Sequence, residues 1–293
     1  MKKIRKAVLP VAGFGTRVLP ATKTIPKEML PIVDRPALQY VVDEAREAGI
    51  EHFVFVTGRN KGAIEDYFDR AYELEYSLRE RGKTEIYEDL NATTPEAGTM
   101  SFVRQQSAKG LGHAIWCARD VIGNDPFAIL LPDVLVKAKK GCLAQMVDAY
   151  NEVGGNIIAV DAVPEENVSS YGVIAPKAGR EKRSDGLIEM SGMVEKPAQD
   201  KAPSNLKITG RYILQPRIME LLSDQAAGAG GEIQLTDAMA RLMSEQDFFA
   251  LEYQGQDYDC GSKYGYFETV MAYAMDHPEI GEQARHLIKT HAS

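Results

Sequence analysis

Short apolar runs and amphipathic segments take turns along the first half of the chain. Four apolar runs predict buried strands, at residues 7–11, 52–56, 101–104 and 127–131. Apolar side chains three and four positions apart predict helices, at residues 36–48, 61–70 and 112–122. Strand–helix–strand order at this spacing favours parallel pairing with right-handed crossovers. The first half therefore predicts a parallel sheet with helices packed against it.

The pattern changes after about residue 155, where polar loops instead of helices separate the apolar segments. The predicted strands of this second half occupy residues 156–163, 171–174, 187–194, 208–214 and 248–253. Helices are predicted at residues 232–243, 263–276 and 278–291. We expect an α/β fold with a Rossmann-like, mostly parallel central sheet flanked by helices. A smaller, partly antiparallel region is expected beside that sheet.

Two segments fit neither pattern. Residues 71–98 are rich in Glu, Arg and Lys and have little strand character, so we expect an excursion outside the sheet, a helical arm used in oligomer contact. Residues 225–231 read QAAGAGG and predict a flexible loop.

Composition excludes several classes of protein. With 293 residues the chain can form one large α/β domain, and its net charge of −8 argues against general affinity for nucleic acid. No apolar run is long enough to span a bilayer, and the N-terminal residues lack a long apolar region and a cleavage site, so no membrane contact is expected. Three widely spaced cysteines predict neither a zinc site nor a disulfide framework, which favours a reducing, cytoplasmic compartment.

The strongest candidate for chemistry is the loop that follows the first predicted strand. Gly13 and Gly15 let the backbone turn sharply and approach a bound group closely. Successive backbone N–H groups in such a turn form an anion-binding concavity, to which Arg17 adds a fixed positive charge. Lys27 supplies a mobile charge suited to a phosphate.

More common glycine motifs fit this loop badly. A dinucleotide fingerprint needs a third glycine where Val18 stands, and no Gly-Lys-Ser/Thr follows Gly15 as a Walker A loop requires. An ordinary turn between a strand and a helix is the plainer interpretation. However, Pro20, Pro26 and Pro31 prevent one long helix, so we expect an extended loop over a site.

The motif G-x-G-T-R at residues 13–17, followed by P-K-x-M-L-P at residues 26–31, resembles the signature of the sugar-nucleotide pyrophosphorylases. These are nucleotidyltransferases that make NDP-sugars, and residues 22–30 are most similar to the bacterial UTP–glucose-1-phosphate uridylyltransferases. The resemblance continues in motif order from Lys6 to the end of the chain. It implies that UTP and α-D-glucose 1-phosphate give UDP-glucose and pyrophosphate, a step of polysaccharide biosynthesis.

The resemblance also implies an organisation. One nucleotidyltransferase domain would span residues 1–293, with a nucleotide-binding half to about residue 155, a sugar-binding half to about residue 262 and C-terminal helices after it. The enzyme would be a homodimer or homotetramer.

The nucleotide-binding residues implied by the family are Ala12, Gly13, Gly15, Thr16, Gln105 and Gly110, with Arg17 and Lys27 catalytic. Gln105 would hold the pyrimidine edge, because an amide offers both a donor and an acceptor. Gln106 is adjacent, so this assignment rests on spacing. His113 and Trp116 are interpreted as packing or surface residues.

The family implies a Mg²⁺ site and a sugar site. Asp133 follows a buried strand, where ligands bind in open α/β sheets, and resembles the Mg²⁺ ligand, with Asp259 as a second carboxylate. An aspartate after a proline is also common in turns. The sugar-phosphate residues would be Gly172, Glu195 and Lys196, with Lys196 also catalytic. Adjacent strand residues point oppositely, so either Glu195 and Lys196 are solvated surface charges or a local bend joins them in one site.

Two other functional classes and one related enzyme are the alternative interpretations of this sequence. A nicotinamide or flavin oxidoreductase fails on the missing third glycine and leaves the P-K-E-M-L-P and E-K-P segments unexplained. A non-catalytic nucleotide-binding homologue would have lost charged residues that are present here. A glucose-1-phosphate thymidylyltransferase is the nearest alternative, because thymine and uracil present the same hydrogen-bonding edge.

Overall fold

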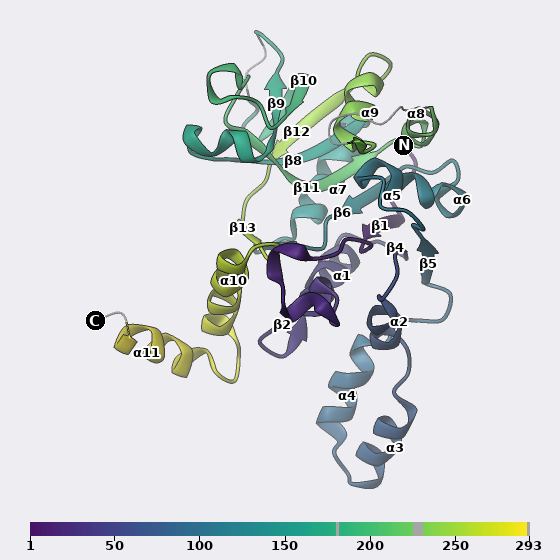
Figure 1. Cartoon of the computed structure of the whole chain (residues 1–293), viewed down its shortest axis with the longest axis vertical. Helices are drawn as coiled ribbons and strands as arrows, with labels where there is room; N and C mark the ends of the chain where they lie inside the picture. Colours follow the sequence, from purple (N-terminus) through teal and green to yellow (C-terminus); the bar gives the residue numbers. More distant parts are fainter. Residues whose placement is uncertain (180–181, 225–230, 292–293) are drawn as a thin grey trace.

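The computed structural model describes residues 1–179, 182–224 and 231–291, so the predicted loop at 225–231 lies outside the described residues except for Gly231. A nine-stranded sheet organises the molecule (Figure 1). Its strands, in order across the sheet, are β5 (Met100–Arg104), β4 (His52–Thr57), β1 (Lys6–Pro10), β6 (Phe127–Leu130), β11 (Leu206–Leu214), β8 (Asn156–Ala162), β12 (Phe248–Glu252), β10 (Leu187–Glu195) and β9 (Gly172–Pro176).

The α/β class is confirmed, but the sheet is mixed and not mostly parallel, because beyond β6 the antiparallel pairs outnumber the one parallel pair, β8 with β12. Strands β5, β4, β1 and β6 run parallel as expected. Strand β11 then enters antiparallel to both β6 and β8, and β10 is antiparallel to β12 and β9. The region expected beside the sheet is therefore continuous with it. Apolar runs show that a strand is buried, but they do not show which neighbour it pairs with.

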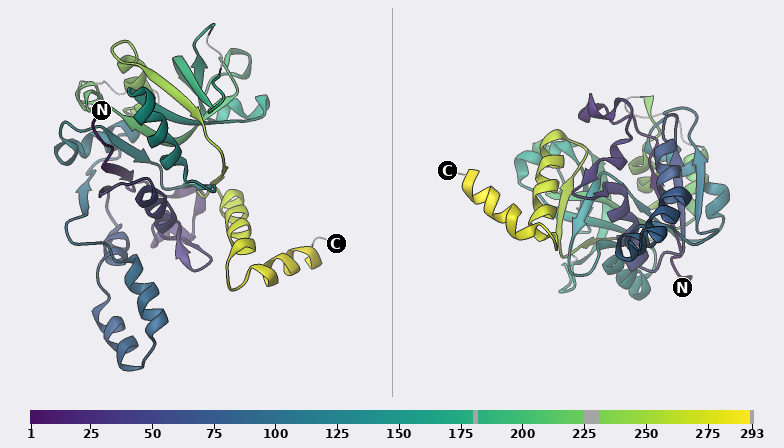
Figure 2. Two further views of the ribbon diagram at one scale, coloured as in Figure 1. Left: turned by 180° about the vertical axis from the view of Figure 1, so that it is seen from behind. Right: turned by 90° about the horizontal axis from the view of Figure 1, so that it is seen from below.

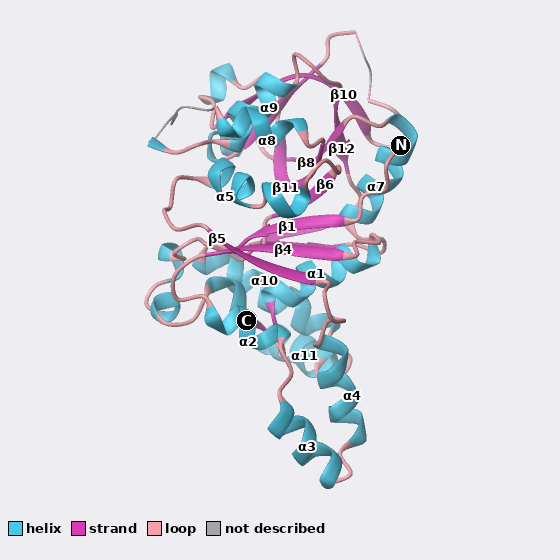
Figure 3. Ribbon diagram, turned by 90° about the vertical axis from the view of Figure 1, so that its right-hand side faces the viewer, coloured by secondary structure: helices cyan, strands magenta, loops and turns pink. Residues whose placement is uncertain are grey.

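Helices cover both faces of the sheet (Figure 3). They are α1 (Ala37–Glu47), α2 (Gly62–Phe68), α3 (Tyr72–Glu80), α4 (Thr84–Thr93), α5 (Leu111–Cys117), α6 (Arg119–Ile122), α7 (Cys142–Val153), α8 (Arg217–Ser223), α9 (Leu235–Leu242), α10 (Lys263–Asp276) and α11 (Gly281–His291). Side chains of a strand alternate between faces. Thus Ala7 and Leu9 join the core under α1 and α7, and Val8 joins the core under α5, α8 and α9.

Most predicted helices are confirmed, with three differences. The segment at 112–122 is two short helices, α5 and α6, and the helix predicted from residue 232 begins only at Leu235. Sequence analysis predicts no helix at α7 or α8. None of the helices among the described residues is long and apolar enough to cross a membrane.

The arm at residues 71–98 is a helical hairpin, α3 and α4, that projects away from the sheet (Figure 1), as the sequence predicts. The C-terminal helices α10 and α11 extend from the body of the molecule (Figure 2). The arm exposes large apolar side chains, namely those of Tyr72, Leu74, Tyr76 and Ile86. A role of the arm in oligomer contact stays a prediction.

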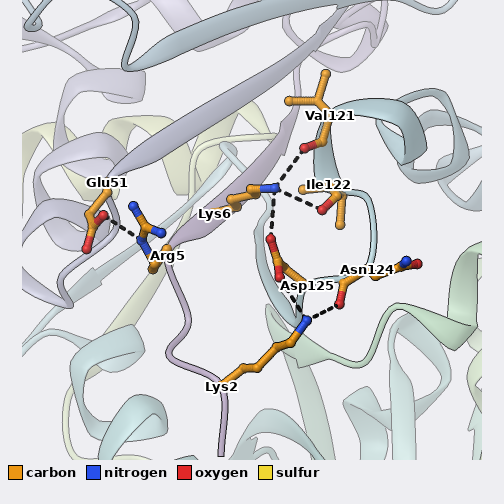
Figure 4. Close-up of polar contacts among 8 residues, drawn as sticks. All are labelled: Lys2, Arg5, Lys6, Glu51, Val121, Ile122, Asn124 and Asp125. Carbon is orange, nitrogen blue, oxygen red and sulfur yellow. Dashed lines mark hydrogen bonds and ion pairs between the residues drawn. The ribbon is translucent and has the colours of Figure 1, made fainter.

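Polar contacts fix the amino end of β1 (Figure 4). The Nζ atom of Lys6 donates to the backbone oxygens of Val121 at 3.0 Å and Ile122 at 2.9 Å, and lies 3.0 Å from Asp125 Oδ2. Lys2 Nζ also reaches Asp125, at 3.2 Å. These contacts anchor the amino end of β1. The loop with Gly13 and Gly15 follows the opposite end of the same strand.

A buried ion pair holds the centre of the molecule together. Arg211 on β11 is 0% exposed, and its Nη2 lies 2.9 Å from Glu44 Oε2 on α1. The guanidinium also donates to the backbone oxygens of Leu131 at 3.0 Å and Val134 at 2.7 Å. These two residues flank the Pro132–Asp133 turn, so one side chain fixes both a helix and a candidate site residue.

We expect Arg211→Met to lower the free energy of unfolding by about 3–5 kcal/mol, because it leaves the Glu44 carboxylate buried without its counter-ion. Urea denaturation measures the loss. The double variant Glu44→Leu, Arg211→Met should recover part of it, since the buried charge is then gone. A loss below about 1 kcal/mol would show that the pair does not govern stability.

Candidate active site

Two cavities open at the carboxyl ends of the parallel strands and meet. The first cavity, of about 470 Å³, lies between the loop after β1 and the segment that follows β5. The second cavity, of about 320 Å³, lies against β9, β10 and β11. The residues that line both are Arg17, Leu111, Leu131 and Asp133. A ligand that spans both cavities would therefore pass Arg17 and Asp133.

The loop after β1 is extended, as predicted, with only three short turns of 3₁₀ helix at Thr16–Val18, Ala21–Lys23 and Lys27–Met29. Four of its predicted site residues line the first cavity: Ala12, Gly13, Arg17 and Lys27.

Gly15 and Thr16 line neither cavity among the described residues. Gly15 has φ +65°, and a Cβ there would lie 3.2 Å from Lys27 Cβ and 3.3 Å from Thr22 Cβ. Thr22 Oγ1 also donates to the Gly15 backbone oxygen at 2.7 Å. Gly15 thus lets the loop fold under Lys27.

Asp133 is held by the two cations of this loop. Lys27 Nζ lies 2.6 Å and Arg17 Nη2 lies 3.8 Å from Asp133 Oδ2. Burial by itself would raise the pKa of Asp133, but the charge of Lys27, its hydrogen bond and the charge of Arg17 hold that pKa below the ordinary value. Asp133 is therefore ionised at neutral pH.

Asp259 lies beside Asp133 through a small separate sheet. Strands β7 (Val134–Lys137) and β13 (Gln256–Asp259) pair antiparallel with Asp259 opposite Val134. A Cβ on Gly261 would lie 2.9 Å from Asp259 Oδ1 and 3.1 Å from Asp133 Oδ2. The two carboxylates therefore converge on Gly261, and a larger residue there would have to displace them.

This donor set fits a hard divalent cation. Two carboxylates bind Mg²⁺ in many phosphate-handling sites, with water and substrate phosphates as the other ligands. No third Asp, Glu, His or Cys joins them in the part of the chain that the structure describes. Water and phosphate oxygens would therefore complete the coordination.

Gln105 is oriented by two neighbours. Its Nε2 donates to the Gly110 backbone oxygen at 3.1 Å and lies 3.0 Å from His113 Nδ1. Burial, followed by the charges of Lys109 and Arg119, lowers the pKa of His113, so the ring is neutral and Nδ1 accepts. With Nε2 engaged, Oε1 is the amide atom presented to a ligand.

The remaining residues of this segment have different positions. Gln106 is exposed and does not line the first cavity, whereas Gln105 does. Gly110 also lines it, but a Cβ there would lie 2.8 Å from the Ile233 backbone oxygen and 2.8 Å from Glu232 Cβ. The tight contact with residues 232–233 thus requires glycine at position 110, independently of the space that a bound ligand would need there.

The predicted sugar-side residues Gly172, Glu195 and Lys196 all line the second cavity. Lys196 has φ +46°, and its backbone N–H donates to the backbone oxygen of Tyr171 at 3.0 Å. The predicted bend after Glu195 is therefore present. Thr236 Oγ1 donates to Glu195 Oε2 at 3.1 Å.

Sequence analysis misses two ion pairs. Lys207 and Asp257 line the second cavity with Lys207 Nζ 2.6 Å from Asp257 Oδ2, and the only pattern that points to Asp257 is its place two residues before Asp259. Lys61 and Glu28 form a fully buried pair at 2.7 Å, which holds the turn that carries Lys27.

Comparisons with known proteins give matches over nearly the whole chain. The family model "Nucleotidyl transferase" matches residues 6–276. The UTP–glucose-1-phosphate uridylyltransferase of Bacillus subtilis (strain 168) is 49% identical over 283 residues, which cover 97% of this chain and 95% of that protein.

Two solved structures have the same fold. A UTP-bound UGPase from Acinetobacter baumannii is 46% identical with a TM-score of 0.89, over 97% of this chain and 98% of that one. A UDP-glucose pyrophosphorylase complexed with UDP-glucose is 44% identical with a TM-score of 0.81, over 94% of this chain and 100% of that one.

Proposed function

Because the chain belongs to the nucleotidyl transferase family, we propose that it forms UDP-glucose and pyrophosphate from UTP and glucose 1-phosphate. The observation that carries the proposal is the meeting of two cavities at Asp133 and Arg17. One cavity then takes the nucleotide and the other takes the sugar phosphate. Relatives named for this reaction, or bound to its substrate or product, support the assignment.

The proposed chemistry needs no side-chain nucleophile, because the phosphate of glucose 1-phosphate is already anionic. It attacks the α-phosphorus of UTP in line, and pyrophosphate leaves from the opposite side. Catalysis then consists of holding two polyanions together and stabilising the charge of the leaving group. Lys196 holds the sugar phosphate, Glu195 accepts hydrogen bonds from sugar hydroxyls, and Arg17 and Lys27 hold the triphosphate.

Lys27 has a second part in this proposal. In the absence of substrate its ammonium neutralises Asp133 at 2.6 Å. Once the triphosphate enters, Lys27 pairs with phosphate oxygens and leaves the carboxylate to a cation. Asp133 and Asp259 are the residues that would hold Mg²⁺, which supplies positive charge next to the phosphates.

One assay separates this function from the alternatives. Pyrophosphate release is measured with glucose 1-phosphate and each of ATP, GTP, CTP, UTP and dTTP. Turnover with UTP well above the others supports the proposal, and preference for dTTP identifies a thymidylyltransferase. No turnover with any of them, together with tight UTP binding, identifies a non-catalytic nucleotide-binding protein.

We expect Gln105→Ala to lower the preference for UTP over CTP by about tenfold or more, because Oε1 no longer accepts from the pyrimidine edge. Binding of glucose 1-phosphate should change little, since Gln105 does not line the second cavity. The ratio of kcat/KM for the two nucleotides measures the effect. Gln106→Ala is the matched control, and a larger loss there would transfer the role to Gln106.

The remaining parts of the proposal concern the whole protein. A homodimer or homotetramer is supported by the apolar side chains on the α3–α4 arm. Light scattering of the wild type and of Tyr76→Glu would test it, since a monomer in both cases contradicts an arm contact. We also propose that the chain is a cytoplasmic enzyme of polysaccharide biosynthesis. It forms one domain, made of a nucleotide-binding half and a sugar-binding half.

A further inference from the structure

Strand β13 carries Asp259 at its carboxyl end, where the Gly261 backbone N–H donates to Asp259 Oδ1 at 2.8 Å and the Cys260 N–H donates to the Asp133 backbone oxygen at 2.7 Å. The strand has four residues and, in the part of the chain that the structure describes, pairs only with β7, outside the nine-stranded sheet. A two-stranded pair of this length is marginally stable by itself. The residues of β13 before Asp259 therefore need a further support that links the strand to the main sheet.

Asp257 supplies that support. Residues two apart on a strand share a face, and both Asp257 and Asp259 line the second cavity. Asp257 Oδ2 lies 2.6 Å from Lys207 Nζ, and its Oδ1 accepts from the Tyr253 hydroxyl at 3.2 Å. Lys207 belongs to β11 and Tyr253 directly follows β12, so both partners tie β13 to the main sheet.

Lys207 lies between the strand that carries Asp259 and the residue that holds the bend at Lys196. Its side chain is only 11% exposed, and its Nζ lies 5.3 Å from the centre of the Tyr171 ring. The backbone oxygen of Tyr171 in turn accepts a hydrogen bond from the backbone N–H of Lys196 at 3.0 Å. One ammonium thus contacts the strand of Asp259 on one side and the residue that fixes the Lys196 bend on the other.

A second carboxyl group completes the cluster. Asp161 lies opposite Lys207 in the pairing of β8 with β11. Burial, and then the charge of Asp257, raise the pKa of Asp161, and Lys207 opposes this rise. Lys207 therefore has two carboxyl groups near it, of which Asp257 is the one that pairs with its ammonium.

We propose that Lys207 and Asp257 are a positioning pair that sets Asp259 against Asp133 and sets both at a fixed separation from Lys196. Neither residue is proposed to react. The pair orients the cation-binding carboxylates relative to the sugar-phosphate site. This inference rests on the proposed function, because its cation readout is taken with UTP bound and its kinetic readout with both substrates.

The test compares Lys207→Met, Asp257→Asn and Lys207→Arg with the wild type. Mn²⁺ is titrated into each protein at saturating UTP, and kcat and KM for glucose 1-phosphate are measured in parallel. We expect Lys207→Met and Asp257→Asn to weaken Mn²⁺ binding by about tenfold or more, as loss of outer partners of a metal site does. We also expect a higher KM for glucose 1-phosphate and recovery in Lys207→Arg, which keeps the charge.

Lys6→Met is the matched control. Lys6 is also a partly buried lysine with an aspartate partner (Figure 4), but it lies at the amino end of β1 and lines neither cavity. Its loss should lower the melting temperature and leave Mn²⁺ binding unchanged. Asp257→Asn is nearly isosteric and decides the matter if Lys207→Met fails to fold.

Two results would overturn the inference: Mn²⁺ affinity in Asp257→Asn equal to that of the wild type, or no Mn²⁺ binding by the wild type itself. The proposed function fails separately, if the wild type binds Mn²⁺ but gives no UDP-glucose. In that case the Mn²⁺ titrations of the variants still test the positioning role.

Discussion

Asp133→Asn should lower kcat by about two to three orders of magnitude, the loss expected when one strong electrostatic contact to the reacting phosphates is removed. The substitution keeps the size of the side chain and its hydrogen-bonding oxygen, but it removes the charge that would face Mg²⁺. Because Asp133 has a lowered pKa, it carries that charge throughout the neutral range. Steady-state kinetics at rising Mg²⁺ concentrations measure the effect.

Asp125→Asn provides the matched control, since Asp125 also pairs with a lysine but lies at the amino end of the parallel strands. It should retain normal kcat. Asp259→Asn is expected to have a smaller effect than Asp133→Asn, because Asp259 is the second carboxylate. Near-normal turnover of Asp133→Asn at saturating Mg²⁺ would remove Asp133 from the metal site.

Replacing the two lysines of the site by alanine should impair different steps. Lys196→Ala is expected to raise the KM for glucose 1-phosphate by about tenfold or more while UTP binding stays nearly intact, because one charged hydrogen bond to the sugar phosphate is lost. Lys27→Ala is expected to lower kcat and to weaken pyrophosphate binding in the reverse reaction, because negative charge grows on pyrophosphate as the bond breaks.

Equilibrium binding of UTP and of glucose 1-phosphate to both variants, measured with their kinetics, distinguishes these effects. If Lys196→Ala loses UTP and keeps glucose 1-phosphate, the two substrates occupy the opposite cavities. If both variants behave as the wild type does, neither lysine contacts substrate.

Local patterns predict much of this fold. The apolar run of β1 and the periodic side chains of α1 identify both elements to within about two residues, which is the usual uncertainty of a helix or strand boundary. Pairing between distant strands cannot be predicted in this way. The apolar run of β11 shows only that it is buried, and its place between β6 and β8 depends on residues far away in the sequence.

The same limit applies to the candidate site: residues within sequence motifs can be predicted, and contacts between distant residues cannot. Residues within a motif, such as Lys27 and Glu195, can be named as candidates from the sequence because they match the family pattern, and both line the cavities. The contact between Lys207 and Asp257 could not, because it joins residues 50 positions apart on elements that no motif connects. His113 is an intermediate case: the sequence favours a packing or surface residue, and its contact with Gln105 depends on a ring nitrogen that the fold brings near.

The insertion of β11 in the middle of the sheet has a consequence for how the chain folds as it is made. Until the ribosome reaches Leu206, β6 has no partner on the side away from β1, although all four of its residues are buried in the finished protein. An apolar edge of this kind is a template for aggregation. We expect a fragment that ends near residue 155 to aggregate when expressed alone, and the native sheet to close only after the second half has been synthesised. The slow pairing of distant strands, and not the local helices, would then limit the rate of folding.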